Sequence, residues 1–233
     1  MSTRRDFLRS LLGAGALAGL GRGAVLAANP ARRLVPLGLL LAPGSATERG
    51  ASLGFEEAQR AGDLLQVEFR LAPTSGYALI GSTPPKGSIR ALFLVAGAPG
   101  GSDVPVRLRV YSVASSPRFR REVLARHPGK GLRAVDWHPS LERFGADSLN
   151  LRFQRRFGRS MDEDAWRGWM AVKIAAELAL RSPGADPAAK VGTASFDGHK
   201  GIPLRFDPQD HHLIQPVYVV DARGKLVDEV APE

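Results

Sequence analysis

The most informative segment of the sequence begins with Ser140-Leu-Glu-Arg-Phe-Gly-Ala-Asp-Ser-Leu-Asn-Leu-Arg-Phe-Gln-Arg-Arg-Phe157. Leu149, Phe153 and Phe157 recur at four-residue intervals, which places them on one face of a helix. Gly158 can take the left-handed conformation that ends many helices. The pattern therefore predicts a helix over Ser140–Phe157.

A second helix is predicted directly after the first. Asp162 is a favourable N-cap, and Glu163 and Asp164 place negative charge at the positive end of the helix. Pro183 ends this helix because a proline disfavours helical geometry in the residue before it. Further on, Gln215–Val227 has the pattern of a terminal pair of strands. The second helix carries a broad apolar stripe, whose tryptophans we expect in the core rather than on a partner-facing surface: Trp166, Trp169, Met170, Ile174 and Leu178.

Strands and helices alternate in the upstream part of the chain. Leu34–Leu41 is a continuous apolar run, which is typical of a strand buried on both faces. A helix at Thr47–Arg60 and a half-buried strand at Gln66–Leu71 would complete a right-handed parallel unit. Thr74–Gly87 has the composition of a loop. The other predicted elements are strands at Ile89–Ala96, Val106–Val113 and Leu132–Trp137 and a short helix at Pro117–Arg126.

Length and composition indicate a globular α/β protein. The 233 residues suffice for one core or two small lobes, and 44% hydrophobic with 24% charged residues is ordinary for a folded chain. The absence of cysteine excludes disulfides and thiol catalysis. The formal charge is +9, but no basic run with interleaved aromatic residues occurs, so nucleic acid is not an expected partner.

The N-terminus has the pattern of an export signal. Ser2-Thr-Arg-Arg-Asp-Phe-Leu8 matches the twin-arginine type, and a Gly- and Ala-rich run ends in Val25-Leu-Ala-Ala28, which offers a cleavage site. The alternative is an uncleaved membrane anchor, but the run is too short and too weakly apolar to favour one. We therefore expect residues 1–28 to be removed, and residues 29–233 to be periplasmic without stable membrane insertion.

Several short motifs follow one another in the C-terminal part. They are Phe196-Asp-Gly198, Gly201, Leu204-Arg-Phe-Asp207 and Val217-Tyr-Val-Val220 with a Gly-Lys turn. In this order they resemble type I periplasmic substrate-binding proteins of ABC transporters, the group that includes the branched-chain amino acid-binding proteins. Within that family, the closest similarity is to the substrate-binding-like proteins of PQQ-dependent (quinoprotein) alcohol dehydrogenase systems. The segments that carry it are Trp137-His-Pro139, Phe144-Gly-Ala146, Gly158-Arg-Ser-Met161 and Trp169-Met-Ala-Val172.

The resemblance implies an α/β fold of two lobes, with the chain crossing between them three times and the ligand enclosed in the cleft. Removal of the leader leaves 205 of the 233 residues, which lack most of the strand–helix repeats of two full lobes. We therefore expect a truncated parallel-sheet α/β sandwich with a C-terminal β-hairpin. It would consist of one lobe, or of one lobe with a vestigial second.

The expected ligand site lies in loops that follow the carboxyl ends of the parallel strands, both by the resemblance and by the general rule for open sheets. The predicted ligand-binding residues are Ser45, Ser75, Tyr77, Gly101 and Ser102. Hydroxyl groups and free backbone amides of this kind bind anions well. The alternative is that these loops are only turns.

Other chemistries find little support. The adjacent His211 and His212 would point to opposite faces of an extended segment, so no metal site is predicted. A catalytic role of His138 would need a nucleophile, and no serine of the sequence lies in a nucleophile-elbow motif, so no catalytic residue is predicted. Glu163 and Asp164 are explained as charges at a helix start. We expect neither an enzyme nor a cofactor.

Two functions remain. The first is a substrate-binding-like component of an ABC transporter system, which would present a small polar ligand to a permease. That ligand would be amino acid-like or related to alcohol oxidation. The second is an accessory protein that binds no ligand and serves a periplasmic quinoprotein dehydrogenase.

Overall fold

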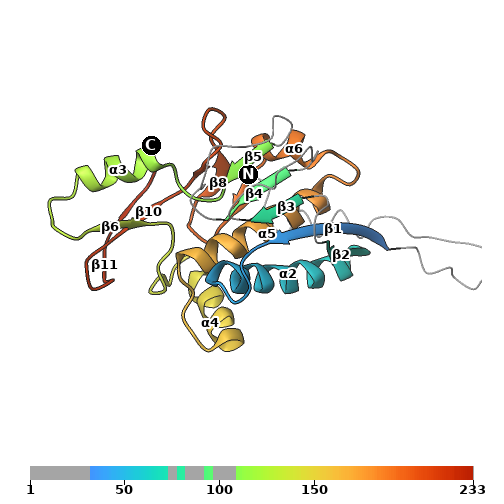
Figure 1. Cartoon of the computed structure of the whole chain (residues 1–233), viewed down its shortest axis with the longest axis horizontal. Helices are drawn as coiled ribbons and strands as arrows, with labels where there is room; N and C mark the ends of the chain where they lie inside the picture. Colours follow the sequence, from blue (N-terminus) through green and yellow to red (C-terminus); the bar gives the residue numbers. More distant parts are fainter. Residues whose placement is uncertain (1–31, 73–77, 82–91, 97–108, 233) are drawn as a thin grey trace, which may run out of the picture. The chain divides into compact units, whose positions relative to one another are not determined.

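The computed structural model describes residues 32–72, 78–81, 92–96 and 109–232 (Figure 1). These residues belong to a unit that begins at Arg32. The predicted signal peptide therefore lies outside the described residues, and its export and cleavage stay predictions.

Five parallel strands form the main sheet, in the order β2-β1-β3-β4-β5. One of them, β3, falls within the segment that we predicted as loop, and that prediction is wrong. Four residues are too few to display a strand pattern, although Ala78 and Ile80 are fully buried. The strands are β1 (Arg33–Leu40), β2 (Val67–Leu71), β3 (Ala78–Gly81), β4 (Leu92–Val95) and β5 (Arg109–Ser112).

Two long helices cover one face of this sheet. They are α2 (Ala46–Leu64) and α5 (Glu163–Arg181), which pack against each other along their length (Figure 1). Their approach is so close that a Cβ on Gly168 would lie 2.0 Å from the carbonyl oxygen of Thr47. Glycine is therefore required at this point of the helix pair, because any larger residue would push the helices apart.

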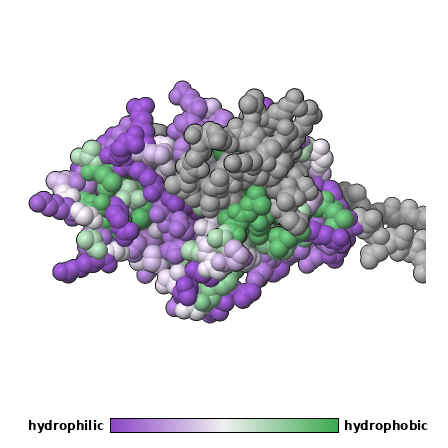
Figure 2. All heavy atoms as spheres, in the orientation of Figure 1, coloured by the Kyte–Doolittle hydropathy of each residue, from purple (hydrophilic) through white to green (hydrophobic). Residues whose placement is uncertain are grey.

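The two faces of β1 differ in burial. Val35 and Leu37 point into the core shared with α2 and α5, whereas the side chain of Leu34 is 51% exposed. The expectation that the apolar run would be buried on both faces is therefore wrong for this end of the strand. Figure 2 shows hydrophobic surface on the side where β1 and β2 lie. Exposed large apolar residues of this region are Leu34, Leu64, Leu65 and Leu71.

A second, smaller sheet is antiparallel, with the order β11-β10-β6. The helix α3 (Pro117–Ala125) packs against it and closes a small core of its own around Val123, Val217 and Val219. Its strands are β6 (Arg133–Val135), β10 (Val217–Val220) and β11 (Leu226–Val230).

Residues 140–181 form the two predicted helices, except at one end. α4 (Ala146–Phe157) begins six residues after the predicted start, because Phe144 and Gly145 have φ angles of 58° and 84°, which a helix cannot accommodate. Gly158 ends α4 in the left-handed conformation, and the Asp162 carboxylate caps α5 by accepting from the amide of Ala165 at 2.8 Å.

Trp166 and Trp169 of α5 are 0% and 1% exposed, which confirms that they belong to the core.

The elements after α5 are short and lead back to the second sheet. They are α6 (Pro187–Lys190), the 3-10 helix η1 (Val191–Thr193), and the sheet of β7 (Phe196–Asp197), β8 (Pro203–Phe206) and β9 (Leu213–Ile214).

Candidate functional site at the junction of the two sheets

Within the described residues, the chain passes between the parallel-sheet part and the second sheet in three places. These connections run from β5 to α3, from β6 to α4 and from β9 to β10. Each contributes one polar residue that is almost fully buried, namely Ser115, Asp136 and Gln215. Burial of polar groups is costly unless they are paired, so the partners of these three residues define the junction.

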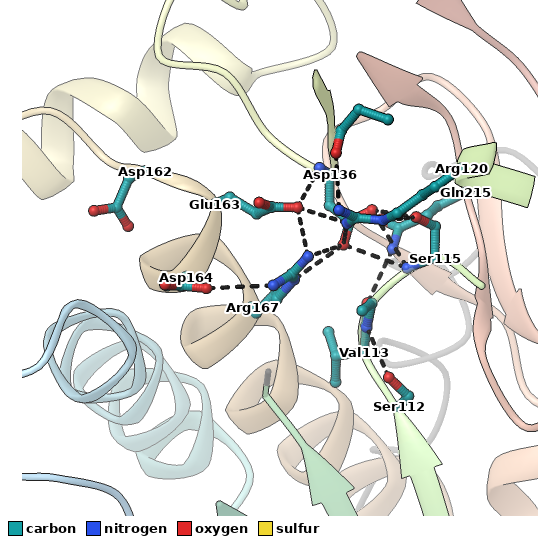
Figure 3. Close-up of polar contacts among 12 residues, drawn as sticks. Ser112, Val113, Ser115, Arg120, Asp136, Asp162, Glu163, Asp164, Arg167 and Gln215 are labelled. Atoms are coloured by element: carbon teal, nitrogen blue, oxygen red, sulfur yellow. Dashed lines mark hydrogen bonds and ion pairs between the residues drawn. The ribbon is translucent and has the colours of Figure 1, made fainter. Parts of the chain in front are cut away.

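Asp136 is the centre of a buried ion cluster (Figure 3). Its carboxylate accepts from the hydroxyl of Ser115 at 2.6 Å and from Nε and Nη2 of Arg167 at 2.9 and 2.8 Å. Arg120 of α3 forms a further ion pair with it at 2.5 Å. Burial alone would raise the pKa of Asp136, but Arg167, Arg120 and Lys200 outweigh burial and lower that pKa to about 2. The carboxylate is therefore ionised at neutral pH.

Glu163 joins this cluster from the first turn of α5. Its carboxylate accepts from the backbone amide of Asp136 at 2.8 Å and pairs with Arg120 and Arg167, each at 2.5 Å. The interpretation of Glu163 as a helix-start charge was therefore incomplete. Asp164 matches that interpretation better, since its side chain is 58% exposed and pairs with Arg167 at 3.3 Å.

Lys200 completes the cluster from the turn between β7 and β8. Only 2% of this residue is exposed. Its Nζ donates to the backbone oxygen of Asp136, to Oε1 of Gln215 at 2.7 Å and to the backbone oxygen of Pro216 at 3.3 Å. The amine also lies 4.1 Å from the ring centroid of Trp166. Burial lowers the pKa of Lys200 to about 7, although Asp136 and Glu163 act in the opposite direction.

The sequence reasoning missed the cluster, apart from Glu163. One signal was present: Asp136 stands between Val135 and Trp137, where a charged side chain at the end of an apolar strand has to find a partner. The partners themselves have no local signature, because Arg167 lies 31 residues and Lys200 64 residues along the chain.

Of the five predicted ligand residues, Ser45 is the one that lies within the described part of the chain. It directly precedes α2 in the turn that follows β1, and its hydroxyl oxygen accepts from the amide of Glu48 at 3.1 Å. Ser45 is thus the N-cap of α2, the role that a plain turn residue would have. Ser75, Tyr77, Gly101 and Ser102 lie outside the described residues, so the predicted ligand site stays a prediction.

A cavity of about 210 Å³ lies beside the junction, between α3 and the turn before β9. Phe119, Leu213 and Ile214 supply its apolar wall, and Asp210 and His212 contribute polar groups. The described part of the chain holds no group of three or more His, Asp or Glu side chains placed to bind a metal ion.

No family model matches the chain, and no curated protein does either. Among solved structures, the chain is similar to the branched-chain amino acid transporter substrate-binding protein LivJ from Streptococcus pneumoniae, in complex with isoleucine. The TM-score is 0.52 at 12% identity, over 84% of this chain and 99% of that chain. A periplasmic binding protein from Burkholderia mallei gives a TM-score of 0.55 at 9% identity, over 85% of this chain and 95% of that chain. The chain has an α/β fold similar to that of periplasmic binding proteins.

The binding-protein fold was predicted from the sequence and is confirmed over most of the chain. Both neighbours are binding proteins. The match to a branched-chain amino acid ABC transporter ligand-binding protein from Burkholderia xenovorans spans 87% of this chain but only 60% of that chain, at 12% identity and a TM-score of 0.38. In the described residues, no helix combines the length and the apolar character needed to cross a membrane. The link to quinoprotein dehydrogenase systems stays a prediction.

Proposed function

We propose that the protein is a periplasmic substrate-binding-like component of an ABC transporter system that binds a small polar ligand. The observation that carries this proposal is the binding-protein fold itself, with its parallel sheet and its three connections to a second sheet. Export by the twin-arginine pathway and removal of residues 1–28 are part of the proposal. The protein would act without catalysis, by presenting its ligand to a permease.

The proposed ligand site is the carboxyl edge of the parallel sheet. Its residues would be Ser45, Ser75, Tyr77, Gly101 and Ser102, whose hydroxyl and amide groups suit a carboxylate or another small anionic group. The ligand would be amino acid-like or related to alcohol oxidation. Amino acids, and the carboxylates that form when alcohols are fully oxidised, carry such a group.

A thermal-shift screen tests this proposal. The protein would be residues 29–233, which contain the whole unit that begins at Arg32. The probes would be amino acids, small alcohols, aldehydes and carboxylates. A ligand at a hundred times its dissociation constant adds about 2.7 kcal/mol to the free energy of unfolding, so a saturable rise in melting temperature is expected for one class. A cooperative melt with no shift for any probe would contradict ligand binding.

A matched pair of serine variants then locates the site. Ser45→Ala and Ser116→Ala each remove an N-cap whose hydroxyl accepts a backbone amide at 3.1 Å, on α2 and α3 respectively. Each should cost about 1 kcal/mol of stability. Only Ser45→Ala should also reduce the ligand-induced shift. Equal ligand shifts in both variants would remove Ser45 from the proposed site.

The second candidate is an accessory protein of a periplasmic quinoprotein dehydrogenase that binds no ligand. The buried ion cluster favours it, because charges paired across the junction oppose the opening and closing that a two-lobed ligand trap uses. Affinity purification from the native host distinguishes the candidates. A co-purifying dehydrogenase with a flat ligand screen would support the accessory function, and permease subunits would support the transporter function.

A further inference from the structure

The three connections between the parallel-sheet part and the second sheet are bonded to one another. Ser115 of the first connection donates to the Asp136 carboxylate of the second. Gln215 of the third donates from Nε2 to the backbone oxygen of Val113 in the first, at 2.9 Å. Lys200 joins the second to the third by donating to the backbone oxygen of Asp136 and to Oε1 of Gln215. Each connection is thus held to both of the others.

Charged groups from the two sides are paired across the same junction. Arg120 belongs to α3, which packs on the second sheet, and it pairs with Glu163 of α5, which packs on the parallel sheet. Arg120 also donates to the backbone oxygen of Ala134 in β6 at 2.9 Å. Rotation of one sheet against the other would separate Arg120 from Glu163 and Asp136 from Arg167, so that each of these groups would lose one of its charged partners.

Lys200 differs from the two arginines in what it contacts. Apart from the exposed Asp164, the cluster contains three basic side chains, Arg120, Arg167 and Lys200, and two acidic ones, Asp136 and Glu163. The amine of Lys200 bonds to backbone oxygens and to a side-chain amide rather than to a carboxylate. Its contacts therefore hold the backbones of the second and third connections together, whereas the arginines hold the acidic side chains.

We propose that this cluster, in which Lys200 bonds the second connection to the third, locks the junction, so that the second sheet keeps one orientation to the parallel sheet with or without a ligand. The protein would then differ in mechanism from a two-lobed trap, which closes when its ligand enters. The proposal does not depend on whether a ligand binds, because the lock consists of residues of the chain alone.

Distances between two spin labels test the lock. The chain has no cysteine, so Arg60→Cys on α2 and Lys225→Cys in the turn between β10 and β11 give two unique, exposed labelling positions. Double electron–electron resonance on the full chain should give a single narrow distance. That distance should be unchanged by isoleucine and by acetate at millimolar concentration. Two separated distances, or a shift with either probe, would overturn the proposal.

Substitution of Lys200 tests whether the cluster is the cause. Lys200→Met keeps the length of the side chain but cannot bond the two connections, so the distance distribution should broaden or split. Lys190→Met, at an exposed position on α6, is the matched control and should leave it unchanged. If Lys200→Met yields no folded protein, Gln215→Leu removes the other half of the same contact and takes its place. A distribution equal to that of the unsubstituted, doubly labelled chain in a folded variant would overturn the role of the cluster.

Discussion

Asp136→Asn is the most informative single change, because it removes one charge at the centre of the cluster and keeps the shape of the side chain. The carboxylate is fully buried and pairs with two arginines, at 2.5 Å and 2.8 Å. Removal of one partner from a buried ion pair typically costs about 3–5 kcal/mol, since the remaining charges lose their compensation. In a domain of this size, such a loss lowers the melting temperature by roughly 6–20 °C.

The same carboxylate contributes a pH-dependent part of this stability. The pKa of Asp136 is about 2 in the folded protein, against 3.8 for an ordinary aspartate, so the unfolded chain takes up a proton first as the pH falls. Its contribution is complete above about pH 4 and is lost as the pH drops toward 2. The size of the shift corresponds to about 2 kcal/mol. Asp136→Asn should abolish this part of the acid dependence.

The control is Asp164→Asn, which removes the other aspartate that pairs with Arg167. Its side chain is 58% exposed, so the cost should stay below about 1 kcal/mol. Urea unfolding at pH 7 measures both variants, and equal slopes against denaturant would show that the unfolded states are comparable. If both variants lost the same small amount, the pairing around Asp136 would not stabilise the fold and the reasoning would be refuted.

Two further predictions concern Lys200 and the helix pair. The pKa of Lys200 is about 7 in the folded protein, against 10.5 for an ordinary lysine. Between these two pH values the unfolded chain binds more protons than the folded one, so the free energy of unfolding should rise as the pH is raised from 7 to 10.5. Urea midpoints across the same pH range should show this rise in the unsubstituted chain and lose it in Lys200→Met. Gly168→Ala should cost at least about 1–3 kcal/mol, because its Cβ would meet the Thr47 carbonyl at 2.0 Å. Gly192→Ala, whose Cβ would lie 3.4 Å from the Tyr111 hydroxyl, should change the thermal midpoint little, and an equal loss in both variants would contradict the packing argument.

Helix ends were predictable from the sequence wherever one residue determines them. Asp162 and Gly158 mark the start of α5 and the end of α4, because a capping carboxylate and a left-handed glycine act locally. The start of α4 was not predictable in this way. Phe144 adopts a positive φ that its residue type disfavours, and its carbonyl is held by His199 from 55 residues along the chain at 3.0 Å.

The candidate site was much less predictable than the fold. A buried ion cluster depends on which segments meet, and Ser115, Asp136 and Gln215 come from connections whose spacing carries no periodic signal. The strand β3 was missed for a related reason, since its four residues gain their strand character from pairing with β1 and β4. The site therefore follows from tertiary contacts rather than from local pattern.

A locked junction changes what ligand binding would mean for this chain. A trap that closes spends part of its binding free energy on the movement, whereas a fixed site avoids that cost but leaves part of the ligand exposed to water. A thermal shift combined with an unchanged label distance would therefore identify a preformed receptor. A flat thermal response with the same unchanged distance would favour the accessory function, because a rigid surface without a ligand is what a constant protein partner requires. The ligand screen thus decides between the two functions, and the label distance shows whether the site of a receptor would be preformed.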